Sequence, residues 1–211
     1  AVGAVREPPL QAPAPHQGKG HLVSGVVTRY LADLAATMGQ LPVDSIERLI
    51  DLLHQARLEE RQVFLLGNGG SAATASHFCC DLAKNTIATG LPSFRAVSLV
   101  DNAALMTAWA NDTAYDNLFC GQLACLLRPG DVVIGISGSG NSPNVLRAME
   151  LARASGATTV GLTGFAGGRL KGLVDLAIVV PSDCMEQIED LHLVLEHLVV
   201  TALRERAHPP S

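Results

Sequence analysis

The stretch D-V-V-I-G-I-S-G-S-G-N-S-P, from Asp131 to Pro143, carries the clearest structural signal in the chain. After its leading Asp the first half is apolar, which predicts a buried strand over 131–136. The S-G-S-G-N-S turn that follows ends at Pro143, a residue that the first turn of a helix tolerates. The stretch therefore predicts a strand, a turn of small residues and a helix over 144–154.

The same order of elements recurs on both sides of this stretch. Further strands are expected at 63–66, 96–99, 158–162 and 176–180, and further helices at 22–38, 45–59, 72–83, after 101 and at 185–204. Asp101 is the expected N-cap of one helix, and Asp44 or Ser45 that of another. Apolar strands that alternate with helices are typical of a parallel sheet covered on both faces. The sequence thus predicts an α/β fold around a five-stranded parallel sheet, preceded by N-terminal helices.

The turn after 131–136 is also a candidate anion site. Ser137, Ser139 and Ser142 place three hydroxyls close together, interleaved with Gly138 and Gly140. Small residues let the backbone approach an anion, and the free N–H groups and dipole of a helix N-terminus favour negative charge. Without the G-K-[ST] of a Walker A loop the turn does not indicate a nucleotide. We interpret it as a phosphate site, against the plainer interpretation of an ordinary capping turn.

A second glycine-rich turn follows the strand at 63–66. Residues 67–72 match G-x-G-x-x-A, which alone is a weak dinucleotide signal. Such a site needs an acidic residue about 20 positions further on, at the end of the next strand. That strand ends near Leu99, which is too far, so no nicotinamide cofactor is expected.

Two predicted helices carry imidazoles and carboxylates at helical spacing. His77 and Asp81 share one face, Glu189 and His197 share another, and His192 lies on or near the face of Glu189. This set suits a divalent cation such as zinc, and it offers the acid and base that enediol chemistry needs. The alternative is a pair of solvated helix faces without a metal.

Several motifs together resemble the sugar isomerase (SIS) domain and, within it, the phosphoheptose isomerases, which act on sedoheptulose 7-phosphate. The motifs are L-L-G-N-G-G-S-A-A-T-A-S-H-F at 65–78, A-N-D at 110–112, G-D-V-V-I-G-I-S-G-S-G-N-S-P-N-V at 130–145, G-L-T-G-F-A-G-G-R-L at 161–170 and I-E-D-L-H-L-V-L-E-H at 188–197. We therefore expect a SIS domain at 21–207, after a Pro/Ala-rich tail at 1–20 that we expect to be flexible.

This resemblance implies a flavodoxin-like three-layer α/β/α sandwich, a homotetramer with shared active sites, and ketose-to-aldose isomerisation of a sugar phosphate with one bound zinc per active site. By motif position the substrate and its phosphate would contact Asn68, Gly69, Gly70, Ser71, Asn111, Asp112, Ser137, Gly138, Ser139, Ser142 and Glu189. The metal would be held by His77, Asp81, Glu189 and His197. Asp81 would be the base and His197 the acid.

Two of these positions depart from the family pattern. The family has Glu where this chain has Asp81, and the lost methylene draws a base back by about 1.3–1.5 Å. It has Gln where this chain has Glu189, which adds a negative charge at a metal ligand. An altered substrate such as another heptulose or an eight-carbon ketose phosphate, a changed metal and a weakened enzyme all remain open.

Two other functions also remain open. The first is a non-catalytic SIS protein that senses a sugar phosphate or associates with a replication initiator. The second is a hexose or amino-sugar phosphate isomerase, whose branches lack the E-x7-H arrangement of Glu189 and His197.

Composition limits the partners and the location. The net charge of -5 without a basic run argues against nucleic acid, and no apolar run reaches the roughly 18–20 residues of a membrane span. No signal peptide is recognisable. Five cysteines without C-x-x-C indicate a reduced, cytoplasmic protein, with Cys79 and Cys80 expected in the core. The first residue is Ala, which leaves a trimmed product and a piece of a longer fused protein open.

Overall fold

A computed structural model describes residues 20–207, which fall into two units divided after Ala36. The described part of the first unit is helical, and its helix α1 (Gly20–Met38) confirms the helix expected at 22–38. Its apolar side chains Val26, Val27 and Leu31 are exposed. The predicted tail lies outside the described residues, apart from Gly20, where α1 begins.

The second unit is built on a parallel sheet. Its strands are β1 (Gln62–Gly67), β2 (Arg95–Ser98), β3 (Val132–Ser137), β4 (Thr158–Thr163) and β5 (Leu176–Val179). They pair in the order β2-β1-β3-β4-β5, and every pairing is parallel. The predicted five-stranded parallel sheet is therefore confirmed, with each strand within two residues of its expected bounds.

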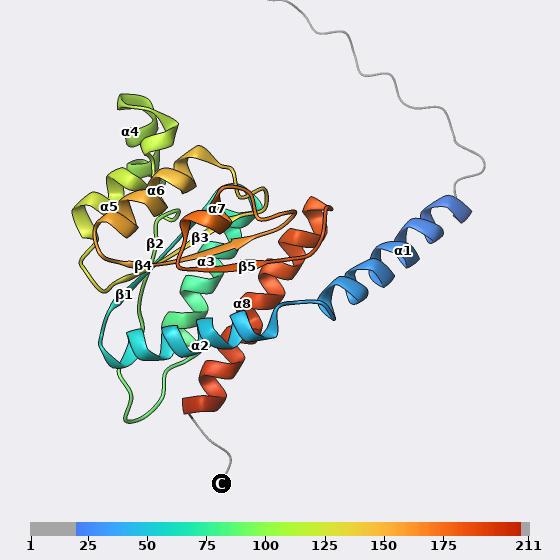
Figure 1. The fold of residues 1–211 in the computed structure, drawn as a ribbon, viewed down its shortest axis with the longest axis horizontal. Helices are drawn as coiled ribbons and strands as arrows, with labels where there is room; N and C mark the ends of the chain where they lie inside the picture. The colour runs from blue at the N-terminus through green and yellow to red at the C-terminus, as the bar shows by residue number, and fades with distance from the viewer. Residues whose placement is uncertain (1–19, 208–211) are drawn as a thin grey trace, which may run out of the picture. The chain divides into compact units, whose positions relative to one another are not determined.

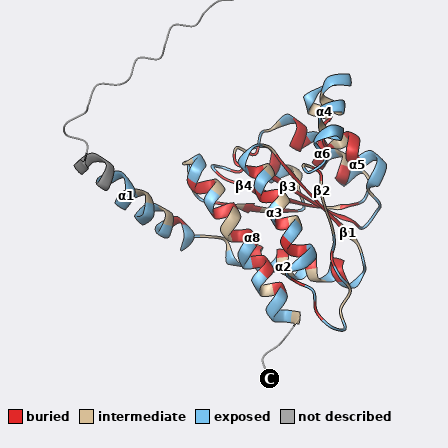
Figure 2. Ribbon diagram, turned by 180° about the vertical axis from the view of Figure 1, so that it is seen from behind, coloured by how far each residue is buried: buried red, intermediate tan, exposed pale blue. Residues whose placement is uncertain are grey.

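Helices cover both faces of the sheet and make three layers (Figure 1). One face packs against α2 (Val43–Leu58), α3 (Gly70–Lys84) and α8 (Met185–Ala207). The other carries α5 (Cys120–Leu126), α6 (Pro143–Ala154) and α7 (Leu170–Leu173), with α4 (Ala103–Asp112) and the 3-10 turn η1 (Tyr115–Asn117) beside them. Figure 2 shows the buried residues along the strands and on the inner sides of these helices.

Alternate residues of each strand pack into the hydrophobic layers on the two faces of the sheet. Phe64, Leu66 and Val133 pack with α6 residues such as Met149 in one hydrophobic cluster. Gly135 faces the same helix, where an added Cβ would lie 2.9 Å from the sulfur of Met149. Close helix-on-sheet packing of this kind needs small and aliphatic side chains, which the composition supplies.

The two expected caps are wrong in detail. Asn102, and not Asp101, caps α4, because its Oδ1 accepts the N–H of Leu105 at 3.0 Å. The N-cap of α2 is Pro42, which has no side chain that can accept a hydrogen bond. Asp44 lies in the first turn of α2 instead, where its charge favours the positive end of the helix.

The cysteines depart in part from their expected burial. Cys80 is exposed and Cys79 is half-buried, so the expected core position is wrong for Cys80. Burial raises the pKa of the Cys79 thiol. None of the five cysteines forms a disulfide. Within residues 20–207, no helix is both long and apolar enough to cross a bilayer.

The sheet order brings the turns after β1 and β3 together. These strands are neighbours, with Gly67 paired to Ile136, while their following helices lie on opposite faces. Ligands of open α/β sheets bind at such a switch point. The approach is close: a Cβ on Gly67 would lie 2.7 Å from the carbonyl oxygen of Ser71 and 2.9 Å from that of Ile136.

Candidate functional site

A cavity of about 140 Å³ opens where these two turns meet the start of α8. We call it the phosphate pocket. Its lining residues are Asn68, Ser71, Ile136, Ser137, Gly138, Ser139, Ser142, Met185 and Glu189. Seven of these were predicted as substrate or phosphate contacts from the sequence. The structure thus gathers side chains from both glycine-rich turns and from α8 in one place.

The serine turn is held in a fixed shape. The Oγ atoms of Ser137 and Ser142 are 3.1 Å apart, and the N–H of Gly140 donates to the carbonyl of Ser137 at 2.9 Å. Gly140 has a φ of +64°, and an added Cβ there would collide with the carbonyl oxygen of Gly167. The carbonyl of Gly138 accepts the N–H of Gly164 at 2.9 Å. The turn is therefore preorganised by its own backbone.

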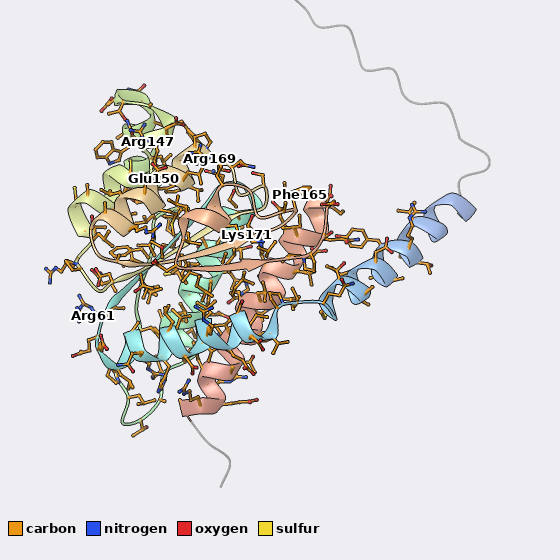
Figure 3. The ribbon with its side chains drawn as sticks, viewed as in Figure 1. Arg61, Arg147, Glu150, Phe165, Arg169 and Lys171 are labelled. Atoms are coloured by element: carbon orange, nitrogen blue, oxygen red, sulfur yellow. The ribbon has the colours of Figure 1, made fainter. Side chains whose placement is uncertain are left out.

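Among the residues that the structure describes, no cationic side chain lines the phosphate pocket. Arg169 and Lys171 follow the next turn of the chain, and Nη2 of Arg169 lies 3.8 Å from a carboxylate oxygen of Glu150, outside the pocket (Figure 3). An anion in the pocket would be held by N–H groups, hydroxyls and the N-terminus of α6.

Asn68 is oriented by residues that the sequence analysis did not single out. The side-chain amides of Asn68 and Asn144 pair reciprocally, with both N···O distances at 2.8 Å. The hydroxyl of Tyr115 also donates to Oδ1 of Asn68, at 3.0 Å. Asn144 is buried in the structure. In the sequence, its place directly after Pro143 was the signal that could have pointed to it.

Glu189 lies in the phosphate pocket against the start of α3. Its carboxylate occupies the space that a side chain on Gly70 would need. Gly69, the N-cap of α3, has a φ of +55°. A carboxylate near a helix N-terminus is favoured by the helix dipole.

Asn111 and Asp112 are not brought to the phosphate pocket. Both are exposed at the end of α4, where Nδ2 of Asn111 donates to Oδ1 of Asp112 at 2.8 Å. Asp112 lines a separate hollow together with Trp109 and Thr113. Their contact with substrate remains a prediction.

A second group of functional side chains joins α3 to α8. His77, Asp81, Glu196 and His197 each offer a ligand atom, and these atoms all lie within 4.8 Å of one another. We call this group the imidazole–carboxylate cluster. Nε2 of His77 is 3.8 Å from Oδ1 of Asp81, and Nε2 of His197 is 3.3 Å from Oε2 of Glu196. The two imidazole rings lie edge to face, with their ring centres 5.0 Å apart.

Three of the four predicted metal ligands therefore come together. The fourth member of the cluster is Glu196, which the sequence analysis did not select, while Glu189 lies in the phosphate pocket. A metal role for Glu189 remains a prediction. Its place in the stripe of α8 that carries Ile188, His192, Val199 and Leu203 indicates burial, but it does not indicate contact with the side chains of α3.

The carboxyl group of Glu196 is in an unusual environment. The residue is 0% exposed, and burial, followed by the negative charge of Asp81, raises its pKa to about 8. Neither of its oxygens has a hydrogen-bond partner among the described residues. Asp81 accepts a hydrogen bond from Nδ2 of Asn85 at 2.8 Å. Two imidazoles and two carboxyl groups, one of them buried without a hydrogen-bond partner, fit a divalent cation.

His192 has a structural position outside the cluster. It is buried, and its Nε2 lies 3.2 Å from the carbonyl oxygen of Thr163 at the end of β4. Burial lowers its pKa to about 4, so the ring is neutral and Nε2–H can donate to this carbonyl. His192 thereby joins α8 to the sheet.

Comparison with known proteins gives consistent matches. The SIS domain family matches residues 28–164. A phosphoheptose isomerase of Trichlorobacter lovleyi is 35% identical over 174 residues, which are 82% of this chain and 84% of that protein. The structure of the phosphoheptose isomerase from Neisseria gonorrhoeae matches with a TM-score of 0.79 at 29% identity, over 86% of this chain and 98% of that one. For a phosphoheptose isomerase from Francisella tularensis the TM-score is 0.81 at 25% identity, over 90% and 100%.

Proposed function

This chain belongs to the SIS domain family, in which it is an aldose–ketose isomerase of the phosphoheptose isomerase type, and from this premise we propose that its substrate is sedoheptulose 7-phosphate or a closely similar higher ketose phosphate. The observation that carries the proposal is the placement of the phosphate pocket and the imidazole–carboxylate cluster along α3. Ser71 lines the first and His77 belongs to the second, about 9 Å further along the helix axis. An extended seven-carbon ketose phosphate spans about 9 Å from phosphorus to carbonyl carbon, at ordinary bond lengths.

The phosphate end of the sugar would occupy the serine turn. The hydroxyls of Ser137, Ser139 and Ser142 and the N-terminus of α6 supply donors to its oxygens. Asn68, fixed by Asn144, presents an amide to the sugar hydroxyls. Glu189 is an acceptor in the same pocket, suited to a hydroxyl and unfavourable for the phosphate itself.

Proton transfer would take place at the imidazole–carboxylate cluster. Asp81 removes a proton from the carbon next to the ketose carbonyl and returns it to the neighbouring carbon, through an enediol. His197 transfers a proton between the two oxygens, so that the ketose and aldose contain the same atoms. His77 and His197 are exposed enough to be reached by a sugar, with side chains 44% and 51% exposed.

We also propose that the cluster holds zinc. The unpartnered carboxylate of Glu196 and the mixed nitrogen and oxygen donors fit such an ion. When bound, zinc supplies Lewis-acid polarisation of the substrate carbonyl. His77, Asp81 and His197 would hold it.

A homotetramer with shared active sites is part of the proposal. The hollow beside His197 on α8 is lined by Val194, Leu198, Thr201, Ala202 and Glu205, and its apolar part is a surface that a neighbouring subunit could cover. A cytoplasmic location is also proposed, supported by five cysteines that form no disulfide.

The test is conversion of sedoheptulose 7-phosphate by the zinc-loaded protein, followed by NMR alongside a panel of other ketose phosphates. We expect the aldose phosphate to appear, and Asp81→Asn to lower turnover by about 10²–10⁴-fold. Asp44→Asn, at an exposed carboxylate of α2, is the matched control and should keep the wild-type rate. No aldose from any panel member, or undiminished turnover in Asp81→Asn, would contradict the proposal.

A further inference from the structure

We propose that Glu196 is a ligand of the divalent cation in this chain, joining His77, Asp81 and His197. The inference rests on the proposed metal-assisted function and deepens it by naming the carboxylate that completes the metal site. Neither motif position nor helical spacing pointed to this residue. It follows from where the folded chain places the side chain.

The first observation is a buried acid with little compensation. Glu196 lies on the core side of α8, between Leu195 and Val199, and is 0% exposed. Both of its oxygens lack a hydrogen-bond partner in the part of the chain that the structure describes. Its nearest basic group is Nε2 of the adjacent His197, 3.3 Å from Oε2, and no Lys or Arg of the described residues pairs with it. Burying a carboxyl group with so little compensation is unfavourable. A bound cation would supply the missing partner.

The second observation is convergence. The oxygen of Glu196 lies within 4.8 Å of donor atoms from His77, Asp81 and His197, which come from two different helices. Tetrahedral zinc ligands are about 3.3–3.5 Å apart, given metal–ligand bonds near 2.1 Å. The Glu196–His197 distance of 3.3 Å already agrees with this spacing, and the His77–Asp81 distance of 3.8 Å is slightly longer. Small side-chain movements would close the set around one ion.

Burial also separates a ligand role from a proton-transfer role. A base must touch the sugar, but the oxygens of Glu196 have no exposed surface. The carboxyl group of Asp81 retains a little exposure and lies beside the exposed His77. Glu196 can therefore bind the cation from the core side, while the other three ligands remain on the side that a substrate can reach.

Glu189 is the natural comparison, because it also lies on α8 and was the expected ligand. Its carboxylate lies against Gly70 in the phosphate pocket and is absent from the imidazole–carboxylate cluster. Replacing Glu196 should therefore weaken zinc binding, and replacing Glu189 should not.

The experiment compares Glu196→Gln with Glu189→Ala in the 211-residue chain. Each protein is stripped of metal, and its zinc affinity is measured by competition with a chromophoric chelator. We expect Glu196→Gln to weaken zinc binding by about 10–100-fold and to change the visible absorption of the Co²⁺-substituted protein. Glu189→Ala, which leaves no oxygen donor at that position, should stay within about threefold of wild type. Unchanged affinity in Glu196→Gln, or an equal loss in Glu189→Ala, would overturn the inference.

Thermal unfolding provides the folding control. Metal-free Glu196→Gln should be at least as stable as the metal-free wild type, because it removes a buried unpaired acid. Only the rise in melting temperature on adding zinc should shrink. Glu196→Met, of similar volume, is a second variant for which the same result is expected. A full zinc-induced rise in both variants would count against the ligand role.

Zinc binding and turnover separate this inference from the proposed function. If Glu196→Gln binds zinc more weakly but the wild-type protein converts no ketose phosphate, Glu196 is a zinc ligand and the proposed substrate is wrong. Wild-type protein that converts sedoheptulose 7-phosphate, while Glu196→Gln keeps full zinc affinity, would refute the ligand and leave the proposed function intact.

Discussion

His192 is a single residue through which stability should depend on pH. Its pKa falls from the ordinary 6.5 to about 4 because the folded chain buries the ring. The unfolded chain takes up this proton below about pH 6.5, and the folded chain does so only near its lower pKa. The stability present at neutral pH is therefore lost as the pH falls from 6.5 towards 4.

The size of this loss follows from the shift. Between pH 7 and 4.5 we expect His192 to account for about 2–3 kcal/mol of the free energy of unfolding, at about 1.4 kcal/mol per pKa unit. Urea unfolding of wild type and His192→Gln at both pH values measures it, since Gln can still donate to Thr163 but does not titrate. Parallel pH profiles for the two proteins would show that the prediction is wrong.

Gly140 is the residue of the serine turn that tolerates no side chain. Its positive φ and the collision with the carbonyl of Gly167 should make Gly140→Ala cost about 1–3 kcal/mol of stability. We also expect a raised KM, because the turn would move. Gly172→Ala, where an added Cβ meets nothing, is the matched control for urea unfolding and kinetics. Equal stability in the two variants would contradict this account.

At the scale of elements, α2 holds the connection between α3 and β2. Arg57 is almost fully buried and donates from Nε to the carbonyl of Pro92 at 2.5 Å and from Nη2 to that of Thr86 at 3.0 Å. Its guanidinium also lies 5.3 Å from the ring centre of Phe94. One side chain therefore ties three points of this connection to α2.

Arg57→Ala should release that connection. We expect a loss of about 2–4 kcal/mol in the free energy of unfolding, because two buried carbonyls lose a charged donor. Amide hydrogen exchange over 85–94 should speed up. Arg48→Ala, at an exposed position of the same helix, should change neither quantity. Unaltered exchange in Arg57→Ala would show that other contacts hold the segment.

Helices and strands were predictable where an apolar pattern runs over enough residues or where one residue marks an end. All five strands appear as apolar runs, and Pro143 marks the start of α6. Helices α5 and α7 were missed because seven and four residues are too short to show a helical period. Asn102 shows why caps shift: adjacent Asp and Asn have nearly equal cap preference, so the backbone decides between them.

Site residues were predictable where their grouping depends on a single turn or a single helix face. The serine turn and the pair of His77 and Asp81 follow from spacing within one element. Glu196 depends on how α8 packs against α3, which no spacing within α8 reveals. Spacing also misled at Glu189. It shares a helix face with His197, but its carboxylate lies against Gly70 and not beside the imidazole of His197.

At the scale of the whole molecule, the proposed assembly concerns the surface beside the cluster. Leu198 is 42% exposed next to His197. We expect Leu198→Arg to shift the protein from tetramer to smaller species and to lower turnover, because a charge would oppose burial of this face. Light scattering after size exclusion measures the mass. Leu58→Arg, at an equally exposed leucine of α2, should remain tetrameric, and a tetrameric Leu198→Arg would contradict the assignment of this face.

No Lys or Arg of the described residues lines the phosphate pocket, and this has a consequence for competing anions. A cation-rich site would attract any phosphate in the cell, including the free inorganic ion, and would be sensitive to ionic strength. We expect binding in this pocket to depend on the fit of the whole ester, because the Glu189 carboxylate disfavours small anions that bring no sugar hydroxyl. In the proposed function, we therefore expect inorganic phosphate to compete less well for this pocket than for a cation-rich site.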